Sequence, residues 1–303
     1  MDRNHHNFLI VAESGSFTRA SSLHGISQPA LTKSIQKLED IYGVPLFERV
    51  ARGVILTEFG ETLLRSVRAA HNELNHAREE LERMRSGGQS RLRIGAGPLW
   101  AMTIVPEMLA KLEREFQELR AEVTLEHRGA LVKLLEERSI DVAVSGAFEP
   151  LESPTIGYRE LHRASSIVVA RRGHPVHRDN VRSVEDLGSY KWTNMLRNQF
   201  DVVVSASTTI KRVPADPQVT LTTNSINVAL SHAALTDNLV IVPAALAGYV
   251  DMHGLQKVRL PHPFREFGTG VYYLKSVRST PIVRSFFKLL TEWDNARAET
   301  EGR

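Results

Sequence analysis

The chain has 303 residues, 42% hydrophobic and 24% charged, which is an ordinary globular composition with room for two or three domains. It contains no cysteine, which excludes disulfides, thiol redox sensing, cysteine zinc sites and cysteine nucleophiles. The net charge of +3 does not indicate nucleic-acid binding by itself, because residues 1–90 hold 11 basic and 11 acidic side chains and the excess lies beyond them.

Neither a signal peptide nor a membrane span is predicted. The first six residues are not followed by the apolar core of a signal peptide. No run of about 18 apolar residues occurs, so no segment is expected to span a membrane. We therefore expect a cytoplasmic protein.

Two short helices are predicted before residue 25. The apolar residues 8–12 form the first helical segment, which ends at Gly15. Ser16 or Thr18 can cap the next helix, which runs towards Leu23, and Gly25 then breaks the chain. A helix, a glycine-containing turn and a capped helix form the helix-turn-helix arrangement.

Residues 27–39 are predicted to be the helix that enters DNA. Ser27 occupies its N-cap position, and Pro29 lies in the first turn, where a missing N–H has no consequence. Apolar side chains recur at helical spacing and can pack on a small core: Leu31, Ile35, Leu38 and Tyr42. The other side offers hydroxyls and amides for base edges and lysines for phosphates: Ser27, Gln28, Pro29, Thr32, Lys33, Gln36 and Lys37. Taken alone, this segment also fits an ordinary amphipathic surface helix.

A short hairpin follows this helix. Gly43 and Pro45 end the helix, and residues 46–49 and 54–57 are two strand-like runs joined through Arg52. We interpret the hairpin as a wing whose tip offers Arg49 and Arg52 to the DNA backbone or a minor groove.

Residues 57–84 are predicted to form one long helix. Its apolar positions alternate spacings of four and three, the period of a coiled-coil seam: Leu56, Gly60, Leu63, Val67, Ala70, Leu74, Ala77, Leu81 and Met84. So narrow a stripe needs a partner helix, and we favour a second copy of the chain, with Leu63 to Leu81 as the dimer contacts. The alternative is packing against the chain's own C-terminal domain.

Beyond a flexible linker at residues 86–90, strands and helices alternate. Strands are expected at 92–95, 123–126, 141–145, 167–170, 202–205, 219–222, 239–242 and 271–274. Helices are expected at 105–119, 131–137, 225–236, 243–250 and 281–297. This alternation predicts an α/β domain with a mainly parallel sheet, and its length suits two lobes.

Five motifs in the first sixty residues occur in a characteristic order: VAESGSFTRA at 11–20, SQPALT at 27–32, QKLE at 36–39, GVPLFER at 43–49 and LTEFG at 56–60. A weaker match continues at 95–97, 105–106, Gly129, 140–144 and 239–243. On these residues the chain resembles the LysR-type transcriptional regulators over essentially its whole length.

The resemblance implies a fold and a division of the chain. A winged helix-turn-helix domain would occupy residues 1–60, a linker and dimerisation helix 57–85, and a hinge 86–90. An effector domain resembling a periplasmic binding protein would span 91–303, with one lobe at 91–161 and 267–303 and the other at 162–266. The implied function is sequence-specific, effector-responsive regulation of transcription. The implied partners are double-stranded DNA, further copies of the chain in a dimer or a dimer of dimers, and RNA polymerase.

The effector is expected between the lobes, where ligands lie beyond the carboxyl ends of strands. By position in the family, the candidate residues are Gly97, Pro98, Leu99, Trp100, Ser145, Asn198, Phe200, Asn224 and Ser225. Trp100 either covers a flat ligand or packs between the lobes. These residues point to a small carboxylate with an apolar or aromatic body, and no other cofactor is expected.

Other functional classes fit the sequence less well. The histidines show no metal-ligand spacing, and no hydrolase elbow, zinc-peptidase pair or phosphate loop occurs, so we expect no enzyme. A transport-type solute binder would explain residues 91–303 but not the first ninety, and would need a signal peptide. A purely architectural DNA binder would not need the two-lobed domain.

Overall fold

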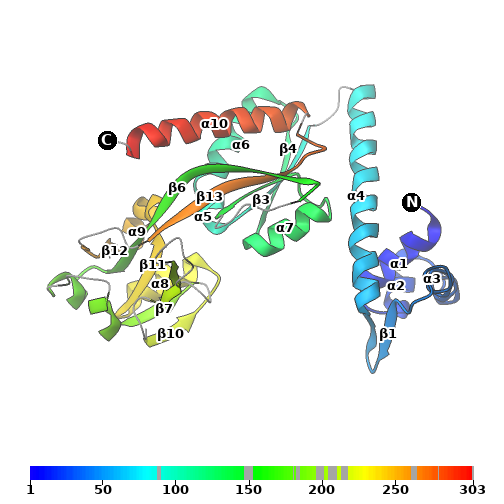
Figure 1. Cartoon of the computed structure of the whole chain (residues 1–303), viewed down its shortest axis with the longest axis horizontal. Helices are drawn as coiled ribbons and strands as arrows, with labels where there is room; N and C mark the ends of the chain where they lie inside the picture. Colours follow the sequence, from blue (N-terminus) through cyan, green and yellow to red (C-terminus); the bar gives the residue numbers. More distant parts are fainter. Residues whose placement is uncertain are drawn as a thin grey trace.

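The computed structural model describes residues 1–86, 90–146, 153–179, 181, 185–195, 201–203, 210–212, 218–260, 265–278 and 280–301. A small helical head forms the N-terminal end, and a larger α/β part forms the rest. The long helix α4 (Glu58–Ser86) lies between them (Figure 1). No helix in the described part of the chain is long and apolar enough to cross a membrane.

The head consists of three helices and a hairpin. The helices are α1 (Arg3–Ser14), α2 (Phe17–His24) and α3 (Gln28–Tyr42), and each ends at a glycine in the left-handed conformation. Strands β1 (Phe47–Val50) and β2 (Gly53–Leu56) pair antiparallel and form the expected wing. Phe8, Leu31 and Leu38 are fully buried and form the centre of the small core.

Two residues of α3 behave differently from expectation. Tyr42 does not join the buried stripe; it is 46% exposed, and its hydroxyl lies 2.8 Å from Nε2 of His5. Ser27 stands at the N-cap position, but its side chain makes no capping hydrogen bond.

The wing is held close to the helices by glycines. The Val54 N–H donates to the carbonyl of Gly15 at 3.0 Å. A Cβ on Gly53 would lie 2.3 Å from that carbonyl oxygen, and Gly53 has a φ of +124°. A Cβ on Gly60, in the first turn of α4, would lie 2.1 Å from the carbonyl oxygen of Leu46. Only glycine allows these backbones to approach so closely.

We expect Gly60→Ala to destabilise the head by about 1–3 kcal/mol, because the added methyl group must displace the backbone at Leu46. Urea unfolding followed by circular dichroism measures the loss. Gly248→Ala is the matched control, since Gly248 lies in a helix and a Cβ there meets nothing within 4 Å. Equal midpoints for Gly60→Ala and the native chain would contradict this account of the close approach.

The α/β part is built on one nine-stranded sheet, and β8 (Asp201–Val203) with β9 (Ile210–Arg212) forms a separate antiparallel pair. The order in the sheet is β10-β7-β11-β6-β13-β5-β3-β4, with β12 also paired to β6. The strands are β3 (Arg91–Ala96), β4 (Arg120–Leu125), β5 (Val142–Gly146), β6 (Ile156–Arg171), β7 (Lys191–Asn194), β10 (Gln218–Thr222), β11 (Asn238–Pro243), β12 (Leu255–Lys257) and β13 (Arg265–Leu274).

The prediction of a mainly parallel sheet is wrong. Strands β4, β3 and β5 pair in parallel at one end, and β10, β7 and β11 at the other. In the middle, β6 and β13 pair antiparallel with each other and with their outer neighbours. These two long strands run between the two ends in opposite directions (Figure 1), so the chain passes from one end to the other and back. Only residues 167–170 of β6 were predicted as strand.

Helices cover both faces of the sheet. Their bounds are α5 (Pro98–Met102), α6 (Ile104–Glu115), α7 (Arg128–Glu136), α8 (Ile226–Leu235), α9 (Ala247–Met252) and α10 (Pro281–Glu301). Short 3-10 turns occur at Pro175–His177, Glu185–Ser189 and Ala244–Leu246, so the helix expected at 243–250 is a turn followed by α9. One buried cluster extends from Leu92 on β3 to Leu230 on α8 and so joins both ends of the sheet.

Candidate functional sites: the DNA-reading head and the effector cleft

The outward face of α3 is available to DNA. Six of its seven predicted contact residues are exposed and Thr32 is half-buried, whereas Leu31 and Leu38 on the opposite side are fully buried. Within the described chain, neither Lys33 nor Lys37 forms an ion pair. The buried leucines therefore orient the helix so that its amides, hydroxyls and ammonium groups face solvent, where they can meet bases and phosphates.

The start of the wing is tied to α3 by a hydrogen bond. The carboxylate of Glu39, near the end of α3, accepts a hydrogen bond from the Leu46 N–H at 2.8 Å. Arg49 on β1 and Arg52 in the tight turn are both exposed. The head thus presents one polar helix and two arginines to a partner, as a winged helix-turn-helix does on a duplex.

Two family models match the chain. The model described as a bacterial regulatory helix-turn-helix protein of the lysR family matches residues 3–61, and that of the LysR substrate binding domain matches residues 85–295. The chain belongs to the LysR family. This LysR-family protein is a DNA-binding regulator of transcription, and its partner is double-stranded DNA.

Known proteins are similar to the chain in sequence or in fold. The chain is 23% identical over 279 residues to an uncharacterized HTH-type transcriptional regulator, YybE, of Bacillus subtilis (strain 168), covering 92% of this chain and 94% of that protein. The crystal structure of CbnR, a LysR family transcriptional regulator, has a TM-score of 0.69 at 18% identity, covering 97% of this chain and 99% of CbnR. Full-length CbnR complexed with its target DNA has a TM-score of 0.68 at 18% identity, covering 96% and 99%.

The apolar stripe of α4 divides into two parts. Leu63 and Val67 pack in the core of the head, and Val67 is only 4% exposed. Farther along, the stripe is open to solvent: Ala70, Leu74, Ala77 and Leu81, of which Leu74 is 51% and Leu81 66% exposed. This open part does not pack on the chain's own α/β part, which contacts the opposite face of α4.

Trp100 is buried on α5, just beyond the first effector-domain strand. It is 6% exposed, its ring lies over Gly97 and Gly146, and its centroid is 6.5 Å from that of Phe267 in an edge-on arrangement. Leu99 and Ser145 are also buried, and Pro98 is half-buried. Phe267 and Gly146 were not predicted at this position, because neither residue lies in a recognisable motif.

The residues expected on the other side of the cleft are only partly placed. Asn224 is exposed, and the Ser225 hydroxyl caps α8 by accepting from the Val228 N–H at 3.4 Å. Asn198 and Phe200 lie outside the described residues. The ligating role of all these side chains therefore remains a prediction.

Proposed function

We propose that this LysR-family regulator recognises one operator sequence through α3 and the wing, and that an effector bound beside Trp100 alters that recognition. The observation that carries the proposal is the polar, exposed face of α3 backed by fully buried Leu31 and Leu38. We adopt the domain limits given by the resemblance: 1–60 for DNA binding, 57–85 for dimerisation, 86–90 as hinge and 91–303 for the effector, with its two lobes. The regulator would act in the cytoplasm, where a bacterial chromosome lies.

We further propose that the open stripe of α4 joins two copies. The stripe from Ala70 to Leu81 is apolar, regular and exposed, and a second identical stripe would cover it. Pairing would hold two heads at a fixed separation, as recognition of two half-sites requires.

The effector we propose is a small anionic metabolite with an apolar or aromatic body. The support is the residue types that converge at the ends of β3 and β5: a buried indole, the buried Ser145 hydroxyl and the backbone at Gly97. Such a ligand acts only through contacts that differ between two arrangements of the protein.

Footprinting tests the proposed function on the DNA upstream of the protein's own gene, over a salt series and with a panel of small acids. We expect a protected, salt-sensitive site whose pattern one acid changes. A solute binder would bind an acid but protect no site. An architectural DNA binder would protect DNA without responding to any acid. Either result would contradict the proposal.

For the cleft, we expect Trp100→Ala to weaken effector binding at least about tenfold, which corresponds to about 1.4 kcal/mol, whereas Trp100→Phe retains most of the affinity. The panel of aromatic and aliphatic acids can be titrated by calorimetry against the three proteins. The phenylalanine variant is the control for loss of packing over Gly97 and Gly146. Unchanged affinity and an unchanged footprint in Trp100→Ala would remove Trp100 from the site.

A further inference from the structure

The polar face of α4 packs against the chain's own effector domain. Arg68 and Glu137 form an ion pair at 3.1 Å, and the Asn72 amide donates to the Glu137 carbonyl at 2.7 Å. At about 100° per residue, positions 68, 72, 76 and 79 share one face, opposite to the open apolar stripe. The helix therefore has two contact faces, an apolar one that is open and a charged one that is occupied within the chain.

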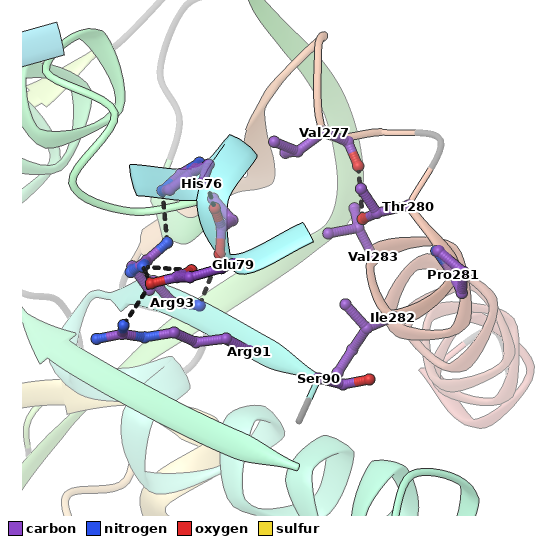
Figure 2. Close-up of a pocket in the computed structure, with 11 residues that line it drawn as sticks. His76, Glu79, Ser90, Arg91, Arg93, Val277, Thr280, Pro281, Ile282 and Val283 are labelled. Carbon is purple, nitrogen blue, oxygen red and sulfur yellow. Dashed lines mark hydrogen bonds and ion pairs between the residues drawn. The ribbon is translucent and has the colours of Figure 1, made fainter. Parts of the chain in front are cut away.

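The centre of this contact is a cluster of four side chains, which we call the latch: His76 and Glu79 of α4 with Arg93 and Asp141 of the effector domain. Figure 2 labels the first three. The Arg93 guanidinium donates to both carboxylate oxygens of Glu79, at 2.8 and 2.9 Å, and to Nε2 of His76. Asp141 accepts from the Arg93 backbone N–H at 2.8 Å, and its other oxygen lies 3.9 Å from Nδ1 of His76.

Three of the four latch side chains are largely buried, whereas that of Glu79 is 34% exposed, and space borders the cluster. The side chains of His76 and Asp141 are only 14% and 8% exposed. Cavities of about 100 and 330 Å³ border the cluster, and Arg91 in their walls pairs with Glu79 at 2.6 Å and with Glu122. Water and counter-ions can therefore reach the ion pairs when the contact loosens.

A strained residue lies at the same contact. Arg138 has a φ of +53°, the one positive value at a non-glycine among the described residues. Its guanidinium pairs with Glu73 of α4 at 2.6 Å and donates to the Ser276 hydroxyl at 3.0 Å. Such a conformation costs about 1–3 kcal/mol and persists where surrounding contacts impose it, often at sites that switch.

The latch is also connected to the proposed cleft. Strand β3 carries Arg93 near its start and leads into Gly97, the N-cap of α5. Strand β5 follows Asp141 directly and contains Ser145 near its end. Both strands belong to one sheet and move as rigid elements. A displacement of their ends at the cleft therefore also displaces Arg93 and Asp141.

We propose that the latch holds α4, and with it the DNA-reading head, at a fixed angle to the effector domain and opens when His76 is protonated or when salt screens the ion pairs. Nε2 of His76 accepts from the Arg93 guanidinium, which requires a neutral imidazole. A protonated ring would put a second cation against Arg93. The charged groups around His76 come from α4, β3, β4, the turn after α7, and the residue before β5: Glu73, Arg78, Glu79, Arg91, Arg93, Glu122, Arg138 and Asp141. Only the DNA-binding role of the head is taken from the proposed function.

The sign of the pH effect follows from burial. Burial lowers the pKa of His76 while the helix is docked, so an undocked His76 takes up a proton first as the pH falls through about 6.5. The docked form therefore loses stability over that range. Burial raises the pKa of Asp141, which favours docking on acidification, but aspartate titrates from a lower ordinary pKa. The His76→Gln variant keeps Asp141 but has no imidazole, so it separates the two contributions.

The test measures the distance between head and effector domain in the full chain. Because the sequence has no cysteine, Asp40→Cys and Glu113→Cys, both at exposed positions, introduce two unique sites for spin labels. Labelled protein is diluted with unlabelled chain so that one pair is observed in each oligomer. Electron–electron double resonance is recorded at about pH 7.5 and 6, and in about 50 and 500 mM salt.

We expect a narrow distance distribution in the native chain at the higher pH in low salt, and a broad one at the lower pH or in high salt. Glu79→Gln should be broad throughout, with the open population raised about tenfold. His76→Gln, which cannot take up a proton, should stay narrow at both pH values. Glu61→Gln is the matched control, an exposed glutamate of α4 without an ion pair in the described chain.

Two results would overturn the latch: a Glu79→Gln distribution identical to that of Glu61→Gln, or a pH response that is the same in His76→Gln and the native chain. Neither depends on an operator or an effector. A latch that behaves as expected in a protein that protects no DNA site would instead count against the proposed function.

Discussion

Leu74→Glu is expected to yield monomers and to weaken operator binding by about 10²–10⁴-fold. Leu74 lies in the middle of the open stripe of α4 and is 51% exposed in the single chain. In a dimer seam its replacement would bury a carboxylate without a partner. The free-energy cost of that burial would exceed the stabilisation that the remaining apolar contacts supply. Each head would then have to find its half-site separately, so the gain from linking two heads would be lost.

Sedimentation and operator binding, measured on the same preparations, check this result. Met252→Glu is the control, because Met252 is an exposed apolar residue away from α4 and a glutamate there should change neither measurement. An unchanged dimer in Leu74→Glu would show that copies associate through another surface.

Gln28→Ala is expected to cost about 1–3 kcal/mol on the correct operator and to relax the base preference at one position. Gln28 is exposed in the first turn of α3, and its amide can both donate to and accept from a base edge. Loss of such a paired contact discriminates between bases, whereas loss of a phosphate contact does not.

Lys37→Ala provides the contrast on the same helix. It should weaken binding about equally on operator and random DNA and reduce the salt slope by about one. Binding isotherms on both DNAs over a salt series give the two patterns. Equal losses on operator and random DNA for Gln28→Ala would show that Gln28 contacts only the backbone.

The head could be predicted from the sequence because its determinants are local. Gly15, Gly25 and Gly43 end its helices, and the spacing of Leu31, Ile35 and Leu38 defines the buried face of α3 within eight residues. A helical period, a cap and a left-handed glycine each act within a few residues of the chain. The side chains proposed to meet DNA were predicted from that buried face, since they occupy the rest of the helix surface.

The arrangement of the sheet was decided by tertiary structure. The pairing of β6 with β13 joins residues about a hundred positions apart. The sequence of either strand does not determine whether the two pair parallel or antiparallel. Trp100 is a similar case, because its burial depends on Gly146 and Phe267, which are distant in sequence. Hydrophobic periodicity tells which residues seek a core, but not which distant segment supplies it.

The two faces of α4 show the same division most clearly. The sequence alone was enough to predict the regular apolar stripe along this helix, because apolar spacing is a local pattern. Its charged face has the composition of an ordinary solvated surface, yet Glu79 meets Arg93 and Glu73 meets Arg138. A charged side chain is stable in water or in an ion pair, so only the folded chain, which brings residues 73 and 138 together, determines which of the two applies.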